Sequence, residues 1–294
     1  MNLKHLSLVP ALLLATSLVS PAKDVADGAV VAKTYVLATK GYIPPVGSVI
    51  DSSRVMSMKG AKMQLNIQGQ MMEGAMTTNE NEVEKYEVLA ADKIRYTLTK
   101  AISEQKVVLM DQPMPVPAQP KPLVGKSAIF TKKDGAWSGK IAEGEASAEE
   151  KTKIEEVAKN LNLDSYFKVY GDEPRKIGDE WEVGAADVLG DDEFEGKIKM
   201  KFTKVEMFEG TECAVFESEL DIDGTPEEME GATLKMTGKL TIHRSLVDQM
   251  DLSIKMDGSM SIIGKMEPQP GMLLDMKVKG AMTMVQTNKL TKGK

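Results

Sequence analysis

Few side chains in this chain could act as a catalytic base or a nucleophile. The two histidines are His5 and His243, and the single cysteine is Cys213. His243 ends a strand-like run beside the permanent cation Arg244, so we interpret it as a polar residue at the surface of a sheet. Cys213 lies in another strand-like run without a histidine partner in sequence, which predicts a small buried residue. The sequence therefore predicts no catalytic triad and no multi-histidine metal site.

Carboxylates are the next candidates for acid–base or metal chemistry. One acidic run spans residues 191–195, and a second combines Asp221, Asp223 and Gly224 with the acidic pair at 227–228. The second run resembles part of a calcium loop, but it lacks the third acidic position before the glycine and a glutamate at the twelfth position. We interpret both runs as turns between strands. Two carboxylates that meet only in the folded chain could still support a hydrolase, so that alternative stays open.

Methionine is the most unusual feature of the composition, with 21 residues in a chain of 294. Met56 and Met58 are two residues apart, as are Met282 and Met284, so each pair would project from one face of a strand. Thioether sulfur selects Cu(I), and such pairs could hold that ion. Methionine also occupies apolar positions in many strands, and no second histidine or cysteine accompanies it, which favours core packing. The sequence predicts no metal site and leaves Cu(I) binding by these pairs open.

Alternation of apolar and polar residues indicates the strands that position these methionines. Between Lys62 and Met71 every second residue is apolar or glycine, which predicts one strand with a single apolar face. The same period recurs around Met200, Met256 and Met276, with lysines on the opposite face. One apolar and one lysine-rich face are typical of an antiparallel sheet that is covered on one side.

The apolar face is the candidate ligand-binding surface, because unbranched, polarizable side chains adapt to variable apolar shapes. Its candidate residues are Met63, Leu65, Ile67, Met71, Met200, Met236, Met256, Met276, Met282 and Met284. We identify no catalytic residue.

One helix and several turns complete the predicted fold. Ser147 and Glu150 form a capping box, and Ile154, Val157 and Leu161 share one face, which predicts a helix over residues 147–160. Turn signals stand at Asp134-Gly135, Glu209-Gly210, Asp223-Gly224 and Asp257-Gly258. We therefore predict a mainly β fold of the α+β class, a curved antiparallel meander sheet or half-barrel with one main helix covering its apolar face.

The sequence divides into five segments. Residues 1–22 are expected to be a signal peptide, because a basic head and an apolar stretch precede Ala22. An N-terminal β portion follows over 23–112, and a linker with five prolines spans 113–122. A hairpin-plus-helix insertion covers 123–176. A C-terminal β meander covers 177–290 and is expected to share one sheet with the N-terminal portion.

Export and charge limit the partners. A signal peptide without a cysteine near its cleavage site predicts a periplasmic or secreted protein, and no later segment of the sequence is apolar enough for a spanning helix. The chain has 37 basic and 44 acidic residues, a balance that disfavours nucleic acid. No glycine loop for phosphate is present, and we expect no cofactor.

The chain resembles a family of uncharacterised exported bacterial proteins whose strands are rich in Met, Lys and Gly. The resemblance rests on the strands from Met56 to Met76, on the phrase Lys176-Ile177-Gly178-Asp179-Glu180-Trp181 before a β run, and on the Met-rich C-terminal meander. It implies no activity. A curved sheet under a helix is also similar to the periplasmic lipoprotein-carrier half-barrels, which is a likeness of architecture alone.

These observations favour a non-catalytic exported protein that binds a lipid or an acylated protein on its Met-rich sheet face. A self-packed structural or interaction protein of the cell envelope is one alternative, and a carboxylate-based hydrolase is another. A cavity lined by methionine would favour ligand binding, a filled core the structural protein, and carboxylates converging in a pocket the hydrolase.

Overall fold

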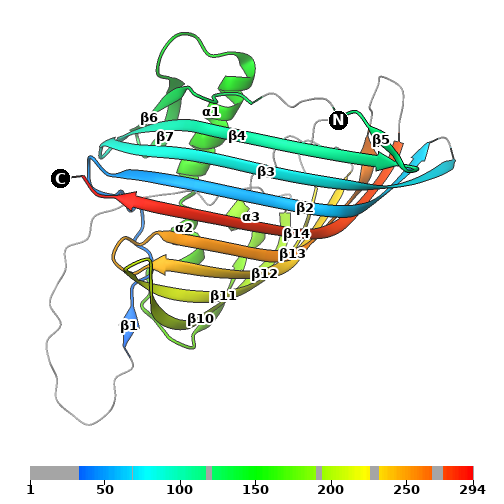
Figure 1. Ribbon diagram of the computed structural model, residues 1–294. Coiled ribbons are helices and arrows are strands. Elements are labelled where there is room, and N and C mark those ends of the chain that lie inside the picture. Colours follow the sequence, from blue (N-terminus) through cyan, green and yellow to red (C-terminus); the bar gives the residue numbers. More distant parts are fainter. Residues whose placement is uncertain are drawn as a thin grey trace, which may run out of the picture.

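The chain folds around one large antiparallel sheet that is open at both edges (Figure 1). The computed structural model describes residues 33–67, 69–116, 121–189, 194–225, 232–266 and 274–293. The sheet has twelve strands in the order β7-β6-β4-β3-β2-β14-β13-β12-β11-β10-β9, with β5 paired to β4. The predicted fold class, a mainly β curved sheet with one main helix, is confirmed. The expected signal peptide lies outside the described residues.

The elements have the following bounds. The strands are β1 (Thr34–Tyr35), β2 (Val49–Ile67), β3 (Gln70–Ala90), β4 (Lys93–Leu109), β5 (Gln112–Met114), β6 (Ser127–Lys133), β7 (Ala136–Ile141), β8 (Arg175–Lys176), β9 (Glu180–Gly184), β10 (Phe194–Phe208), β11 (Thr211–Gly224), β12 (Thr233–Ser245), β13 (Asp251–Met266) and β14 (Leu274–Thr291). The helices are α1 (Ala148–Leu163), α2 (Ser165–Tyr170) and α3 (Ala185–Leu189). Strands β1 and β8 form a small separate sheet.

Two meanders meet at a seam in the middle of the sheet. Strands β2, β3 and β4 are consecutive antiparallel neighbours, and so are β9 to β14. The seam is the antiparallel pair of β2 and β14, in which Asn66 faces Asp275 and Val49 faces Thr291. Segments from both ends of the described chain therefore lie side by side in one sheet (Figure 1).

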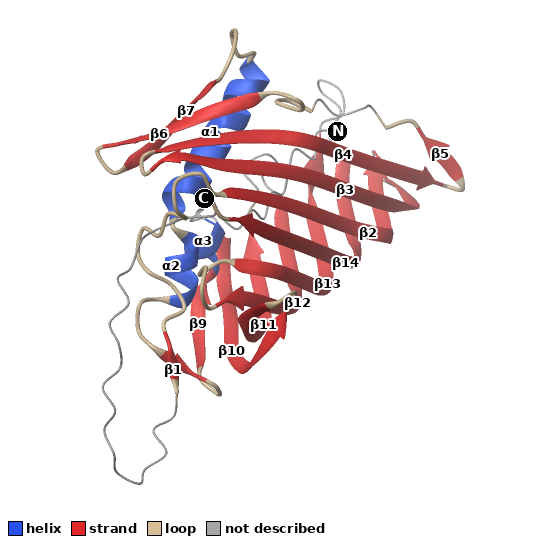
Figure 2. Ribbon diagram, turned by 60° about the vertical axis from the view of Figure 1, so that its left-hand side comes forward, coloured by secondary structure: helices blue, strands red, loops and turns tan. Residues whose placement is uncertain are grey.

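Glycines and a β-bulge accompany the strong curvature of the sheet. Gly258 of β13 faces Gly238 of β12, and a Cβ atom on Gly258 would lie 2.3 Å from the carbonyl oxygen of Thr237. Side chains at these positions cannot fit, so the two strands approach closely. In β2 the pairing with both neighbours shifts at Lys59-Gly60, and Gly60 has φ +57. Figure 2 shows β10–β12 turning behind β2–β4, which makes one face concave.

The three helices lie together on the concave side, near one end of the sheet (Figure 2). The predicted capping box is present in α1, where the Glu150 amide donates to Ser147 Oγ and the Ser147 amide to the Glu150 carboxylate. Two donors at the helix start are thereby satisfied. The apolar face of α1 packs on aromatic residues of β4, β6 and β7. The short helix α2 follows α1 directly and carries Tyr166 and Tyr170.

Two sequence expectations about strands were wrong. The run from Lys62 to Met71 is two strands, because Gly69 has φ +87 and its amide donates to Asn66 Oδ1 at 2.9 Å, which reverses the chain. Met71 therefore lies on β3, pairs with Asn66 and is exposed, whereas Met72 faces Leu65. Asp257-Gly258 is not a turn, since it lies inside β13. There the glycine permits close approach of strands rather than a reversal.

Among the described residues, no helix combines the length and the apolarity that crossing a membrane requires.

Candidate functional site

The concave face carries three apolar clusters, which we name after their positions. The α1 cluster contains the apolar side of α1 with Tyr96, Phe130 and Trp137. The α2 cluster lies between α2 and strands β9–β14, and the distal cluster lies at the end of the sheet remote from the helices. The distal cluster joins Leu109 of β4 to Leu234 of β12, so the two halves of the sheet pack on each other there.

The predicted site residues are divided among these clusters rather than gathered in one place. Met200, Met236, Met256, Met282 and Met284 are buried in the α2 cluster. Met63, Leu65 and Met276 are buried in the distal cluster. Met71 is exposed, and the side chain of Ile67 lies outside the described part of the chain.

An apolar cavity of about 110 Å³ lies in the α2 cluster. Four of the predicted residues, Met200, Met236, Met256 and Met284, line it from β10, β12, β13 and β14. Helix α2 closes it with Tyr166, Val169 and Tyr170, and α3 contributes Val188. The Trp181 indole of β9 donates to the Val169 carbonyl at 2.7 Å and so fixes α2 to the edge of the sheet.

A buried ion pair adjoins this cavity, and Asp251 is one of the lining residues. Arg244 is 1% exposed, its Nη1 lies 2.7 Å from Asp251 Oδ1, and its Nε donates to the Leu37 carbonyl at 2.7 Å. The Tyr170 hydroxyl donates to the same carboxylate oxygen at 3.0 Å. The guanidinium also stacks over the Tyr166 and Tyr170 rings, at 4.6 and 4.1 Å from their centroids. This pair therefore ties α2 to β12, β13 and the segment before β2.

A second cavity, of about 50 Å³, lies between the α2 and distal clusters. Its lining residues are Met56, Met58, Met76, Thr78, Glu80, Met260, Ile262 and Met282. Five of these eight residues are methionines, contributed by β2, β3, β13 and β14.

Charged residues occupy the concave face beside this second cavity, in positions that the alternation did not reveal. Arg54 of β2 faces Glu82 of β3 and forms an ion pair with it. Glu84 accepts hydrogen bonds from Tyr96, at 2.9 Å, and from Tyr86, at 3.2 Å. Burial, and then the charge of Glu82, raise the pKa of Glu80. Strand β3 is polar on both faces here, so its own sequence does not show which face is interior. Only its pairing with β2 could have shown that these residues lie on the interior face.

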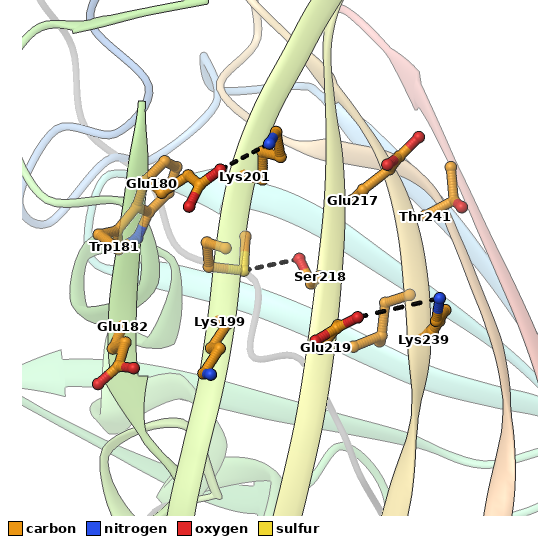
Figure 3. Close-up of a pocket in the computed structure, with 12 residues that line it drawn as sticks. Glu180, Trp181, Glu182, Lys199, Lys201, Glu217, Ser218, Glu219, Lys239 and Thr241 are labelled. Atoms are coloured by element: carbon orange, nitrogen blue, oxygen red, sulfur yellow. Dashed lines mark hydrogen bonds and ion pairs between the residues drawn. The ribbon is translucent and has the colours of Figure 1, made fainter. Parts of the chain in front are cut away.

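A broad depression of about 800 Å³ lies over β9–β12, where the outward-facing residues are charged (Figure 3). Neighbouring strands place opposite charges face to face, so that Glu182, Lys199, Glu219 and Lys239 form one row across four strands. In the next row Lys201 Nζ lies 2.6 Å from Glu180 Oε1. The hydrogen bond from Lys201 lowers the pKa of Glu180, which keeps that carboxylate ionised at neutral pH. It cannot supply the proton that the general acid of a hydrolase donates.

The remaining sequence candidates have ordinary environments. Burial raises the pKa of the Cys213 thiol to about 11, so the thiolate is scarce at neutral pH. His243 is mostly buried rather than at the surface, because its ring stacks on Phe208 and its Nε2 lies 3.1 Å from Glu206 Oε1. Lys235 forms ion pairs with Asp221 and Asp223. Acidic residues 191–193 and 227–228 lie outside the described residues, and within the described ranges no group of three His, Cys, Asp or Glu side chains could hold a metal ion.

No protein-family model and no curated protein matches this chain. Among solved structures, lipovitellin is similar with a TM-score of 0.41 and 8% identity, over 85% of this chain and 26% of the lipovitellin chain. The outer membrane protein OprG of Pseudomonas aeruginosa has a TM-score of 0.17 and 8% identity, over 84% of this chain and 97% of its own. A DUF1329 family protein of Desulfovibrio piger has a TM-score of 0.13 and 10% identity, over 82% and 85%. The chain thus spans about a quarter of lipovitellin, and likenesses this distant carry no functional argument.

Proposed function

We propose that this protein is an exported, non-catalytic binder of a small apolar or acylated ligand, which it holds between α2 and the concave face of the sheet. The supporting observation is the cavity of about 110 Å³ in the α2 cluster, with four methionines in its lining. Unbranched methionine side chains can shift to fit ligands of different shape, which suits a pocket for variable apolar groups. The lining polar groups are the hydroxyls of α2 and Asp251, and these could orient the polar end of a ligand.

The cavity size limits the ligand. An apolar cavity of about 150 Å³ binds a benzene ring, so a cavity of about 110 Å³ accepts a chain of roughly four or five carbons. Each buried methylene contributes about 0.8 kcal/mol, which is roughly a fourfold gain in affinity. Longer acyl chains would bind only if α2 moved away from the sheet.

Calorimetric titration with straight-chain fatty acids from butyrate to laurate tests this proposal. We expect the affinity to rise with each added methylene and to level off when the cavity is full. Met236 is 1% exposed and lines the cavity, so Met236→Trp should fill it and abolish binding. The matched control is Met207→Trp, because Met207 is 66% exposed. Absence of binding by every acid, or equal binding by the Met236→Trp variant, would refute the proposal.

A self-packed structural or interaction protein of the cell envelope is the second candidate. The observation in its favour is that the two cavities described above, of about 110 and 50 Å³, are smaller than the roughly 300–1,000 Å³ of ordinary ligand pockets. A protein of this kind would bind none of the fatty acids, and the Met236→Trp substitution would only perturb its stability.

Export is a separate part of the proposal. It is supported by the basic head and apolar stretch within residues 1–22. When the full chain is expressed in a bacterium, we expect the recovered protein to begin at Lys23 and to be found outside the cytoplasm. An intact N-terminus on cytoplasmic protein, measured by mass spectrometry, would contradict export. The five-segment division of the chain and its membership of the exported family that it resembles also remain proposals.

A further inference from the structure

The second cavity brings together methionines that are far apart in the sequence. On neighbouring strands Met58 faces Met282, and Met56 faces Met284. The sequence pair Met56 and Met58 on β2 therefore lies directly opposite the sequence pair Met282 and Met284 on β14. Met260 of β13 and Met76 of β3 close the cavity on either side of the pair formed by Met58 and Met282. Side chains opposite each other in a sheet have Cβ atoms about 5 Å apart, so their sulfur atoms can approach one ion.

This concentration of sulfur differs from the packing of the α1 cluster on the same sheet. The α1 cluster has thirteen buried residues, of which Met250 is the sole methionine. Aromatic and aliphatic residues therefore fill one part of the concave face of this sheet. In the second cavity five of eight lining residues carry sulfur instead.

A backbone irregularity sits directly beside the cavity. The bulge at Lys59-Gly60 follows Met58, and the Gly60 amide donates to Thr77 Oγ1 at 3.1 Å. One extra residue in a strand reverses which side chains point inward. As a result Met58 and Met63, which regular alternation would place on opposite faces, are both buried on the concave side. Bulges are frequent next to functional sites, where they redirect a side chain.

The cavity also has an anionic group at its boundary. Glu80 lines it and is the cross-strand partner of Met56. The neighbouring Glu82 is ion-paired with Arg54, whereas no described residue forms a close ion pair with Glu80, and the charges of Arg54, Lys121 and Lys153 act on Glu80 and favour its ionised form. Glu80 can therefore balance the charge of a monovalent cation that neutral thioethers bind.

We propose that the methionines of the second cavity form a binding site for Cu(I). Soft thioether sulfur selects this ion, and the described residues around the cavity offer no imidazole or thiolate that would favour zinc instead. Met56, Met58, Met260 and Met282 are the primary ligands. Met76 is a secondary one, because its sulfur already accepts a hydrogen bond from Gln105 Nε2 at 3.0 Å. Binding changes no oxidation state and requires no proton transfer from the methionines.

Titration of the purified protein with Ag(I), a redox-inert stand-in for Cu(I), tests this site. The measurements are native mass spectrometry for stoichiometry and the ¹³C resonances of labelled methionine methyl groups for location. We expect one ion per chain and shifts confined to the methionines of the second cavity. Competition with Cu(I) under reducing conditions should displace the Ag(I).

Paired variants separate metal binding from packing. Met58→Leu with Met282→Leu conserves volume, so the protein should fold, and affinity should fall by more than about tenfold. The control is Met200→Leu with Met236→Leu, which makes the same change in the other cavity and should leave the affinity unchanged. The proposal is overturned if no stoichiometric ion binds, if the shifted resonances belong to other methionines, or if both double variants bind like the unmodified protein. Circular dichroism confirms that each variant is folded.

Discussion

Replacement of Arg244 tests whether the buried ion pair holds α2 and the sheet together. Arg244→Met removes the partner of Asp251 and the donors to the carbonyls of Leu37 and Gln249. Breaking one side of a buried pair leaves an uncompensated charge and typically costs about 3–5 kcal/mol. For a chain of this length that corresponds to a fall in Tm of roughly 10 °C. We therefore expect the Arg244→Met variant to be among the least stable single variants of this protein.

A double-mutant cycle makes the expectation specific to the pair. Asp251→Leu alone should also destabilise, because the guanidinium then loses its counterion. The double variant should cost less than the sum of the two singles, by about 1–3 kcal/mol, since residues in direct contact are coupled. Lys239→Met on the same strand is the control, and because the Lys239 side chain is 81% exposed its cost should stay within about 0.5 kcal/mol.

Urea unfolding followed by tryptophan fluorescence measures these free energies. The fluorescence of Trp181 reports on the packing of α2 against the sheet, because its indole donates a hydrogen bond to α2 and its ring contacts Phe216. An unchanged slope of free energy against urea would show that the variants differ in stability and not in the surface exposed on unfolding. Costs that add to within about 0.5 kcal/mol would refute the pairing argument. So would a cost of Arg244→Met below about 1 kcal/mol, which is the range of exposed ion pairs.

Three further predictions concern other parts of the fold. The Cys213 thiol, with a pKa of about 11, should not react with a thiol reagent at neutral pH until urea unfolds the chain; reaction of the folded protein would contradict its burial. Gly258→Ala should destabilise by about 1–3 kcal/mol because the added methyl group meets the Thr237 carbonyl oxygen, whereas Gly184→Ala, whose Cβ would meet only the flexible Asp187 side chain at 3.2 Å, should cost less; equal costs in urea unfolding would contradict the close approach. The pKa of Glu80 is raised above its ordinary 4.5 in the folded chain, so the folded state binds this proton more tightly, and the contribution of Glu80 to stability falls as pH rises through 4.5 towards the folded pKa. The free energy of unfolding of the Glu80→Gln variant, relative to that of the unmodified protein, should therefore be more favourable at neutral pH than at acidic pH. The same pH dependence of this free energy in both proteins would contradict the argument.

The fold class and the main helix could be predicted because each depends on local signals. The alternation around Met200 and Met256 corresponds to the buried and exposed positions of β10 and β13. The capping box at Ser147 marks the start of α1 without reference to any other element. Chain reversals were harder to predict from the sequence, because the same dipeptide Asp-Gly forms a turn at Asp134-Gly135 but lies inside a strand at Asp257-Gly258, where it permits close approach of the neighbouring strand.

The site could be predicted only in part. The sequence marked the methionines as residues of one face, but the division of that face into clusters depends on curvature and on where the helices lie. The convergence of Met58 with Met282 requires the register of β2 against β14, which no local pattern encodes. The interior charges at Arg54 and Glu82 were missed because their role depends on a cross-strand partner. Hydrophobic periodicity assigns a residue to a face and gives no information about its position along that face.

The seam between β2 and β14 determines the order in which the sheet can assemble. Asn66 and Asp275 are separated by 209 positions in the sequence, whereas the other long strands pair with their immediate neighbours in the chain. Contacts this distant in sequence form late, because the entropy of closing a long loop must be overcome first. Until they form, β2 and β14 are two long unpaired edges that can join strands of other molecules. We therefore expect slow folding with a concentration-dependent loss to aggregation, which ends when β14, the most C-terminal of the described strands, pairs with β2.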